Sequence, residues 1–528
     1  MKSDVLRAAR YGLRCLSRRP TTHSTTIAYQ SYRSFISTPP CREERKWTTP
    51  LAKQLTDAIN ITGPIPLASY MRMCLTADVG GYYTGAIKED RDQFGRKGDF
   101  ITSPEISQIF GELVGVWFVA EWLSQGRPKQ GVQLIEVGPG RGTLMDDMLR
   151  TMRNFKDMAS SIDTVYMVEA SAELRTAQKN LLCGEDAVMT ESKIGWHSTS
   201  KYSGLPVVWT DSIKSIPQDP SKTPFIVAHE FFDALPIHAF QVVEVEPTQQ
   251  ASRTDGTSDS SQNSNPSAPS TAPTKQWREM VVSPTPKGTT HADLKTPKSE
   301  QHEPVPEFQL TLSPSTTRHA QYLPESSPRY WALKTTPGAL IEVCPDASLY
   351  ASDFASRIGG TATAGSSHLV NANANANAKP RPSGAALILD YGPADTIPTN
   401  SLRGIRRHRR VSPFAAPGLA DLSADVDFGA LAEAATRASD GVECHGPVDQ
   451  AFFLESMGIR QRAEMLAKSL GSAAGGGGED KKRELERSWK RLVDRGPGGM
   501  GKVYKVLAIL PENAGRRRPV GFGGDVGV

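Results

Sequence analysis

A glycine-rich turn is the clearest sign of chemistry in this sequence. A short apolar run at residues 133–137 leads into three closely spaced glycines, and a helical pattern of apolar residues follows at 143–152. Small residues let the backbone approach a ligand closely, and the start of a helix adds positive potential. We therefore predict a ligand-binding loop, and its members are Gly138, Gly140, Gly142 and Thr143.

The acidic residue before this loop narrows the class of ligand. The spacing is acid-x-Gly-x-Gly-x-Gly, whereas dinucleotide-binding loops have Gly-x-Gly-x-x-Gly. A carboxylate at Glu136 would repel a pyrophosphate but would suit S-adenosyl-L-methionine, which carries a sulfonium and an ammonium group. A second predicted strand, at residues 165–168, ends at Glu169, where a carboxylate can accept hydrogen bonds from ribose hydroxyls. The pattern favours S-adenosyl-L-methionine over a nicotinamide cofactor; the simpler alternative is a tight turn and an ordinary acid at a strand end.

Several longer motifs in the same order resemble the MidA-like methyltransferases. The matching segments are residues 98–112, 136–144, 229–236, 342–347, 390–392, 403–404, 408, 416–418 and 420–428. The resemblance extends over roughly residues 47–511, apart from low-complexity insertions, and it departs from the family pattern in those insertions and in the Arg-rich tail. This family includes a mitochondrial protein arginine methyltransferase that acts in the assembly of respiratory complex I.

The resemblance implies both a function and part of the site. It implies a matrix enzyme that uses S-adenosyl-L-methionine to dimethylate symmetrically an arginine of a complex I core subunit or assembly intermediate. It also implies that Phe100, Thr102, Ser103 and Pro104 cover the cofactor, although these residues could simply cap a helix. A non-catalytic assembly chaperone that binds the cofactor is the alternative function.

Two carboxylates follow a further predicted strand at residues 225–228. Glu230 and Asp233 therefore lie at the carboxyl edge of the expected sheet, where ligands bind in open α/β folds. Arginine is a poor nucleophile because its guanidinium is protonated and delocalised. A carboxylate pair can orient the guanidinium and accept its proton, so we predict these two as catalytic residues. The alternative is that Asp233 caps a helix and Glu230 contacts the cofactor.

Three further residues are candidates for binding the substrate. Tyr82 and Tyr83 follow a turn and either flank a substrate side chain or pack in the core. His408 lies in an Arg-rich run that is either a substrate-recognition loop or a solvated basic face. No cluster of metal-ligand residues is evident along the sequence, and methyl transfer requires none, so no metal is expected.

The fold expected from these patterns is α/β. Strands alternate with helices, which favours a mostly parallel, doubly wound sheet. The resemblance implies that this sheet is of the Rossmann-like, class I methyltransferase type. A long apolar helix is predicted at residues 105–123, ahead of this sheet. Three more strand-like segments, at residues 238–244, 276–282 and 308–312, predict an inserted appendage.

The predicted organisation divides the chain into eight parts. They are a mitochondrial transit peptide at 1–42, a helical segment that lids the cofactor site at 47–130, the first part of the methyltransferase domain at 131–246, a disordered insertion at 247–275, appendage strands and a return helix at 276–358, a low-complexity insertion at 359–384, the second part of the domain at 385–511, and a disordered tail at 512–528. The first forty residues contain seven Lys and Arg but one acidic residue, which is typical of mitochondrial targeting.

Composition excludes two classes of partner. The net charge is +4 over 528 residues, which is too small a basic excess for a general nucleic-acid binder. No apolar stretch approaches the ~18 residues of a membrane-spanning helix, so stable membrane insertion is not expected. The resemblance to the MidA-like methyltransferases implies a protein substrate as the partner.

Overall fold

The computed structural model describes residues 45–84, 98–99, 101–245, 274–298, 300–360, 379, 381–472 and 478–524. The chain divides into two units, residues 1–46 and 47–528, and every helix and strand of the described residues belongs to the second. The predicted transit peptide and nearly all of the insertion at 247–275 therefore lie outside the described residues, as does the low-complexity repeat within 359–384.

A nine-stranded sheet forms the centre of this unit, in the order β16-β17-β12-β7-β2-β3-β6-β5-β4. Five neighbouring strands are parallel, and these are β12 (Ala385–Tyr391), β7 (Thr223–His229), β2 (Val132–Val137), β3 (Ile162–Val168) and β6 (Pro206–Thr210). The edge strands β17 (Tyr504–Pro511), β16 (Val442–Asp449), β5 (Trp196–Thr199) and β4 (Thr190–Glu191) run antiparallel to their neighbours. This arrangement confirms the predicted α/β, Rossmann-like fold class.

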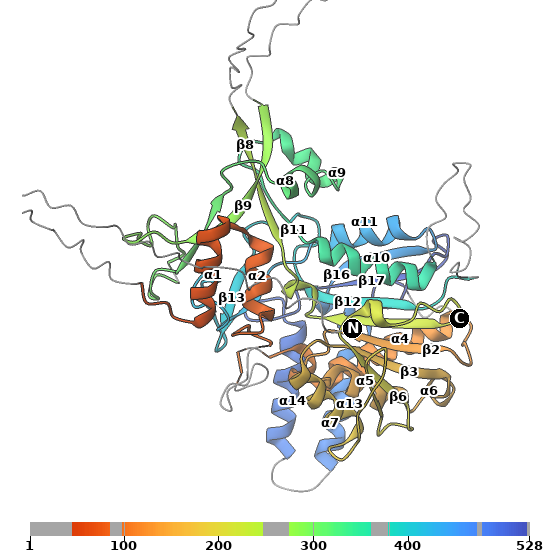
Figure 1. Ribbon diagram of the computed structural model, residues 1–528. Helices are drawn as coiled ribbons and strands as arrows, with labels where there is room; N and C mark the ends of the chain where they lie inside the picture. The colour runs from red at the N-terminus through yellow and green to blue at the C-terminus, as the bar shows by residue number, and fades with distance from the viewer. Residues whose placement is uncertain are drawn as a thin grey trace, which may run out of the picture. The chain divides into compact units, whose positions relative to one another are not determined.

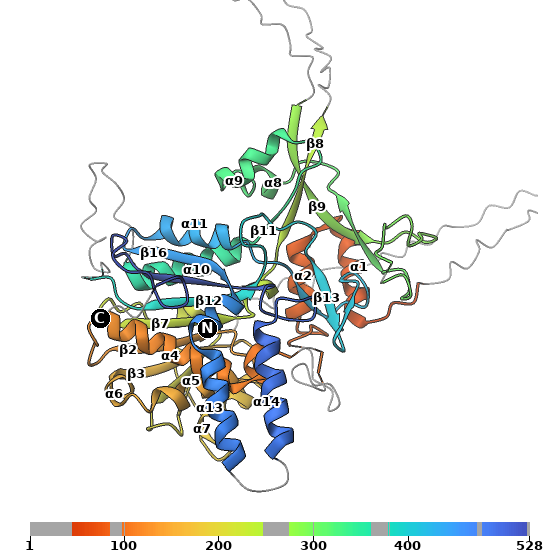
Figure 2. The same cartoon turned by 180° about the vertical axis from the view of Figure 1, so that it is seen from behind.

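Helices cover both faces of the central sheet (Figures 1 and 2). One face packs against α4 (Gln108–Ser124), α5 (Thr143–Met152) and α7 (Ala172–Cys183), and against the C-terminal helices α12 (Gln450–Ser456), α13 (Ile459–Ser472) and α14 (Gly478–Val493). The other face packs against α10 (Pro345–Gly359) and α11 (Phe428–Ala438). Burial on both faces explains why the parallel strands are nearly continuous apolar runs rather than alternating ones.

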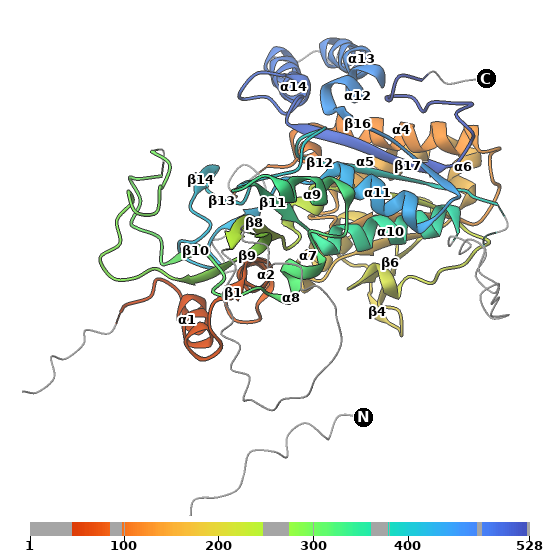
Figure 3. The ribbon, with the colours of Figure 1, turned by 90° about the horizontal axis from the view of Figure 1, so that it is seen from above.

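A second sheet forms the predicted appendage. It contains β8 (His238–Val245), β9 (Thr274–Pro284), β10 (Phe308–Leu312), β11 (Leu340–Val343) and β1 (Ile65–Pro66). Helices α1 (Pro50–Thr62) and α2 (Leu67–Thr76) pack on it through a shared apolar cluster (Figure 3). A small sheet of β13 (Arg403–Arg406), β14 (Arg409–Val411) and β15 (Asp421–Ser423) lies against α2.

Three expected boundaries differ from the structure. The predicted helix at 105–123 is interrupted by Ser107, whose extended backbone (φ −154°) separates α3 (Ser103–Ile106) from α4. Thr274 and Lys275, assigned to an insertion, instead begin β9, because they pair with the end of β8.

The third difference concerns the C-terminal tail, which composition predicted to be disordered. Residues 512–524 pack on α4 instead. The Trp117 indole N–H donates to the Val520 carbonyl at 3.0 Å, and the Phe522 ring packs edge-on against Trp117. The Arg517 guanidinium pairs with both oxygens of Glu121, whose side chain is fully buried. The ring contact of Phe522 with Trp117 and the ion pair of Arg517 with the buried Glu121 order this segment, although its composition is that of a flexible tail.

Candidate active site

The glycine loop between β2 and α5 adopts a backbone that favours glycine at each predicted position. The φ angles of Gly138, Gly140 and Gly142 are +67°, +52° and +83°. At Gly138 space is restricted as well, because a Cβ built there would lie 2.5 Å from the ring of Phe231. The loop is therefore held between the start of α5 and the segment that follows β7.

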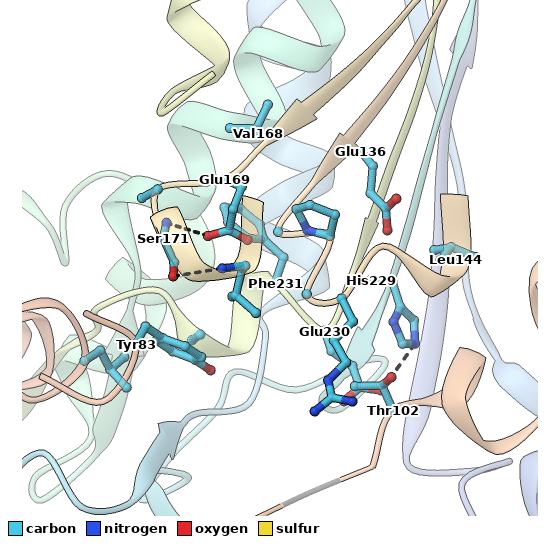
Figure 4. A pocket seen from close by; sticks show the side chains of 18 of the residues that line it. Tyr83, Thr102, Glu136, Leu144, Val168, Glu169, Ser171, His229, Glu230 and Phe231 are labelled. Carbon is cyan, nitrogen blue, oxygen red and sulfur yellow. Dashed lines mark hydrogen bonds and ion pairs between the residues drawn. The ribbon is translucent and has the colours of Figure 1, made fainter. Parts of the chain in front are cut away.

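A cavity of about 270 Å³ opens above this loop, at the carboxyl ends of β2, β3 and β7 (Figure 4). Of the residues predicted from the sequence, its lining includes Tyr83, Thr102, Pro104, Glu136, Gly138, Gly140, Thr143, Glu169 and Glu230. Ser103, Gly142, Asp233, Tyr82 and His408 lie outside the lining, and Phe100 lies outside the described residues. The lining also includes residues that sequence analysis did not identify, among them Leu75, Arg141, Asp211, His229, Phe231 and Tyr350.

Glu136 provides a buried carboxyl group in this cavity. Its side chain is nearly inaccessible, and its Oε2 has no hydrogen-bond partner among the described residues. Burial raises the pKa of this carboxyl well above its usual range, and the charge of Glu169 adds to the increase. A positively charged ligand group beside Oε2 would offset that cost, so the residue fits a sulfonium or an ammonium group.

Glu169 is held by the backbone and by a glutamine. Its Oε1 accepts a hydrogen bond from the Ser171 N–H at 2.8 Å, and its Oε2 accepts one from Gln178 Nε2 at 3.3 Å. The same Nε2 donates to the Gly140 carbonyl at 2.6 Å, and Gln178 Oε1 accepts from Trp209 at 2.9 Å. Burial raises the pKa of Glu169 to about 7. Gln178 thus fixes Glu169 relative to the glycine loop, and the helical pattern of its segment gave no sign of this.

Glu230 directly follows β7 and carries an unusual backbone. Its φ is +49°, which is uncommon for a residue other than glycine and typical of strained functional positions. The carboxylate accepts hydrogen bonds from the Ser103 N–H at 3.4 Å and from the Tyr391 hydroxyl at 3.3 Å. His229 Nε2 lies 3.3 Å from Oε1, and Figure 4 shows this contact at the cavity wall.

Burial determines the charge states of Glu230 and His229 at this wall of the cavity. Burial raises the pKa of Glu230 to about 8, and the neighbouring charge of Asp233 contributes to the increase. Burial also lowers the pKa of His229 to about 3, so the imidazole is neutral at pH 7 and provides no countercharge. A cationic group that enters the cavity would therefore favour the ionised form of Glu230.

Asp233 lies in a second, deeper carboxylate group. Burial raises its pKa well above the usual range, and the charges of Asp390 and Asp421 raise it further, while Arg403 lowers it. Asp390 Oδ2 accepts the N–H groups of Phe231 and Phe232 at 3.1 and 2.8 Å, which fixes the turn after β7. Since Asp233 does not line the cavity, its predicted catalytic role remains a prediction, and its placement favours an indirect effect through Glu230.

The three residues predicted to bind substrate lie at two different places in the structure. Tyr83 lines the cavity, and its hydroxyl donates to Asp421 Oδ1 at 2.8 Å. Tyr82 and His408 instead meet at Asp99: the Tyr82 hydroxyl donates to its Oδ2 at 2.9 Å, and the His408 N–H donates to its carbonyl at 2.8 Å. Asp99 thus connects Tyr82 to the turn between β13 and β14, which contains His408, and the predicted role of Tyr82 and His408 in substrate binding stays a prediction.

The donors and acceptors of the cavity fit S-adenosyl-L-methionine. The buried, unpartnered oxygen of Glu136 would hold a positively charged group, Glu169 would accept hydrogen bonds from ribose hydroxyls, and the glycine loop allows close backbone approach. The order of the parallel strands and the glycine loop after β2 place the site at the sheet edge where α/β enzymes bind nucleosides. Fold and site together define a methyltransferase that uses S-adenosyl-L-methionine.

Comparisons with known proteins agree with this class. A model of the family described as "Putative S-adenosyl-L-methionine-dependent methyltransferase" matches residues 113–448. The chain is 33% identical to the mitochondrial protein arginine methyltransferase NDUFAF7 of Rattus norvegicus over 89% of this chain and 86% of that protein. It is 32% identical to NDUFAF7 of Homo sapiens, over 88% of this chain and 84% of that protein.

A solved structure supports the fold. A likely methyl transferase of the COG1565 superfamily from Burkholderia thailandensis, bound to S-adenosyl-homocysteine, has a TM-score of 0.57 and 21% identity. The alignment covers 90% of this chain and 92% of that one. The match of the family model and the identity to the NDUFAF7 proteins show that the chain belongs to this family of S-adenosyl-L-methionine-dependent methyltransferases, and S-adenosyl-L-methionine is its cofactor.

Proposed function

We propose that this chain methylates an arginine of a protein substrate in the mitochondrial matrix. The proposed client is a core iron–sulfur subunit of complex I, or an assembly intermediate that contains it, and the proposed product is symmetric dimethylarginine. The names of the relatives support arginine as the acceptor and the mitochondrion as the location. No described helix is long and apolar enough to cross a membrane.

The observation that carries the proposal is a buried carboxylate with a raised pKa at the wall of the cofactor cavity. Glu230 lies in the same cavity as Glu136 and Glu169, so a substrate group beside it would also be beside the cofactor (Figure 4). When bound, S-adenosyl-L-methionine supplies a methyl group on a positively charged sulfur. Glu230 would orient the guanidinium, accept its proton as the new N–C bond forms, and release that proton to solvent afterwards.

The surrounding residues would support this step. The Tyr391 hydroxyl and the Ser103 N–H hold the Glu230 carboxylate from two sides. The guanidinium would lower the pKa of Glu230 from its value in the free cavity, so the carboxylate would form as the substrate binds. Asp233 would add negative charge behind Glu230 without touching the substrate, which makes it a positioning residue in this proposal.

Methyl transfer to a defined client tests the proposal. We expect the chain from residue 43 onward, incubated with labelled S-adenosyl-L-methionine and the recombinant iron–sulfur subunit, to incorporate label at arginine as monomethyl and then symmetric dimethyl product, identified by mass spectrometry. Label on lysine or on a carboxylate would contradict the acceptor. Cofactor binding without transfer to any complex I subunit would favour the assembly-chaperone alternative.

The predicted targeting segment yields a separate expectation. Removing residues 1–42 should leave the chain outside mitochondria, because the basic, acid-poor segment would carry the import signal, while cofactor affinity stays unchanged. Cell fractionation and calorimetry on the two forms measure these properties. A control chain with Lys2, Arg7, Arg10 and Arg14 replaced by glutamine should also fail to enter. Matrix import of the truncated form would contradict the transit-peptide prediction.

A further inference from the structure

We propose that His238, Glu279 and His319 form a binding site for a divalent transition metal of the zinc type. His238 is the first residue of β8, Glu279 lies within β9, and His319 belongs to α8 (Arg318–Tyr322). Their potential ligand atoms all lie within 4.8 Å of one another. The site belongs to the appendage sheet, and none of the three residues lines the cofactor cavity.

The distances among these side chains are close to those of a coordinated ion. His238 Nδ1 is 2.7 Å from Glu279 Oε1, and His319 Nδ1 is 3.3 Å from Oε2 of the same carboxylate. The two imidazole rings lie 4.3 Å apart, centroid to centroid. Zinc binds nitrogen and carboxylate oxygen at about 2.0–2.2 Å in tetrahedral geometry, which puts neighbouring ligand atoms about 3.3 Å apart. To admit the ion, the His238–Glu279 contact would open by about half an ångström, and the ligand atoms, now within 4.8 Å of one another, would converge on that spacing.

Charge gives a physical reason for an ion at this place. The Glu279 side chain is fully buried, and within the described part of the chain its ion-pair partners are these two histidines. Burial opposes ionisation of this carboxyl, but hydrogen bonds from His238 and Thr317 and the charge of the two histidines lower the pKa of Glu279 and favour its charged form. A divalent cation would neutralise the carboxylate and bind both imidazoles at once. Two histidines and one glutamate also match a ligand set that zinc uses in proteins.

The surroundings of the three side chains resemble those of a built metal site. The Thr317 hydroxyl donates to Glu279 Oε2 and fixes the carboxylate, and the His238 ring stacks on Phe240 at an interplanar angle of 10°. Such outer contacts orient metal ligands and strengthen binding. The His319 side chain is 48% exposed, so an ion could enter from solvent, with water as its fourth ligand. The ion would fasten α8 to the β8–β9 pair.

The test compares metal binding by the wild type with that of His319→Ala. After chelator treatment of the full chain, we expect calorimetry with ZnCl₂ to reveal one more bound ion in the wild type than in His319→Ala, or an affinity at least about 100-fold higher. Co²⁺ should give the wild type a tetrahedral visible spectrum. Zinc should raise the unfolding temperature of the wild type and not that of the variant.

Two controls keep the result specific. His302 is also an exposed histidine beside a glutamate, so His302→Ala should bind zinc as the wild type does. S-adenosyl-L-methionine affinity should be unchanged in His319→Ala, which separates this site from the proposed function. Equal zinc stoichiometry and affinity in the wild type and His319→Ala, or no saturable binding by either, would overturn the proposal and leave an ordinary hydrogen-bonded histidine–glutamate group.

Discussion

Glu230→Gln is expected to lower the rate of methyl transfer by about 10²- to 10⁴-fold, the usual effect of removing a positioned acid or base. Glutamine keeps the shape of the side chain but cannot accept the proton of the guanidinium. The affinity for S-adenosyl-L-methionine should change little, because the glycine loop, Glu136 and Glu169 are untouched. Single-turnover transfer to the client and calorimetric titration of the cofactor measure the two properties on one variant.

The pH profile gives this prediction a second readout. The active form of Glu230 is the carboxylate, and its pKa in the free cavity is raised to about 8, so kcat/KM should fall as the pH drops below that value. The corresponding fall in kcat should occur at lower pH than the fall in kcat/KM, because a bound guanidinium lowers the pKa of a neighbouring carboxylate. The fall of kcat/KM and the fall of kcat with decreasing pH should both disappear in Glu230→Gln. A purely structural role would not remove them.

Two further variants locate the effect. Glu244→Gln changes an exposed carboxylate on β8 and should leave both rate and pH profile as in the wild type. Asp233→Asn should reduce the rate less than Glu230→Gln does. It should also shift the pH at which the rate falls, since Asp233 acts on Glu230 by charge rather than by contact. Full activity of Glu230→Gln with normal cofactor binding would assign proton transfer to another group and contradict the proposed mechanism.

Much of the methyltransferase fold could be predicted because it depends on local patterns. The strands β2 and β3 are short apolar runs that each lead through a turn into a helix, and the functional acids lie in the last residues of a strand or directly after it. Glu136, Glu169 and Glu230 thus lie near one another although about thirty and sixty residues separate them, because parallel strands end at one edge of the sheet. For these positions, spacing along the chain was enough to predict a shared site.

Contacts that depend on tertiary packing had no such local pattern. Gln178 is a polar residue within an otherwise ordinary helix, yet it connects Glu169 to the Gly140 carbonyl. Asp390 binds the backbone of the turn after β7 from a strand that is more than 150 residues away in sequence. The ordered tail depends on Phe522 and Arg517, whose partners lie on α4. Sequence spacing carries no information on such pairs.

Electrostatics connects the two largest predictions. The cavity and the wall behind it hold six buried or half-buried carboxyl groups whose pKa values are raised, and burial is the first cause for each: Glu136, Glu169, Glu230, Asp233, Asp390 and Asp421. Arg403 is a cation that offsets part of this charge. A site with this excess of carboxylates disfavours phosphates and favours two cations at once, a sulfonium cofactor and a guanidinium substrate.

The second large expected effect is a loss of affinity for the cofactor in Glu136→Gln. Truncating one partner of a buried charge pair costs about 2–5 kcal/mol. At about 1.4 kcal/mol per factor of ten, the dissociation constant of S-adenosyl-L-methionine should rise by at least about 30-fold. Stability should not fall, because the variant removes a buried carboxylate that lacks a partner for Oε2. Calorimetry and thermal unfolding, with the exposed Glu185→Gln as control, measure both properties.

The same variant distinguishes which cationic group Glu136 recognises. S-adenosyl-homocysteine keeps the ammonium of S-adenosyl-L-methionine but has a neutral sulfur. If Glu136 binds the ammonium, Glu136→Gln should weaken both ligands by the same factor; if it faces the sulfonium, only S-adenosyl-L-methionine should lose affinity. Either outcome supports a cationic ligand beside Oε2, whereas unchanged affinity for both would remove Glu136 from the site. Parallel loss of affinity and of unfolding temperature would instead assign Glu136 to the fold, where its carboxyl has a backbone hydrogen bond with Met145.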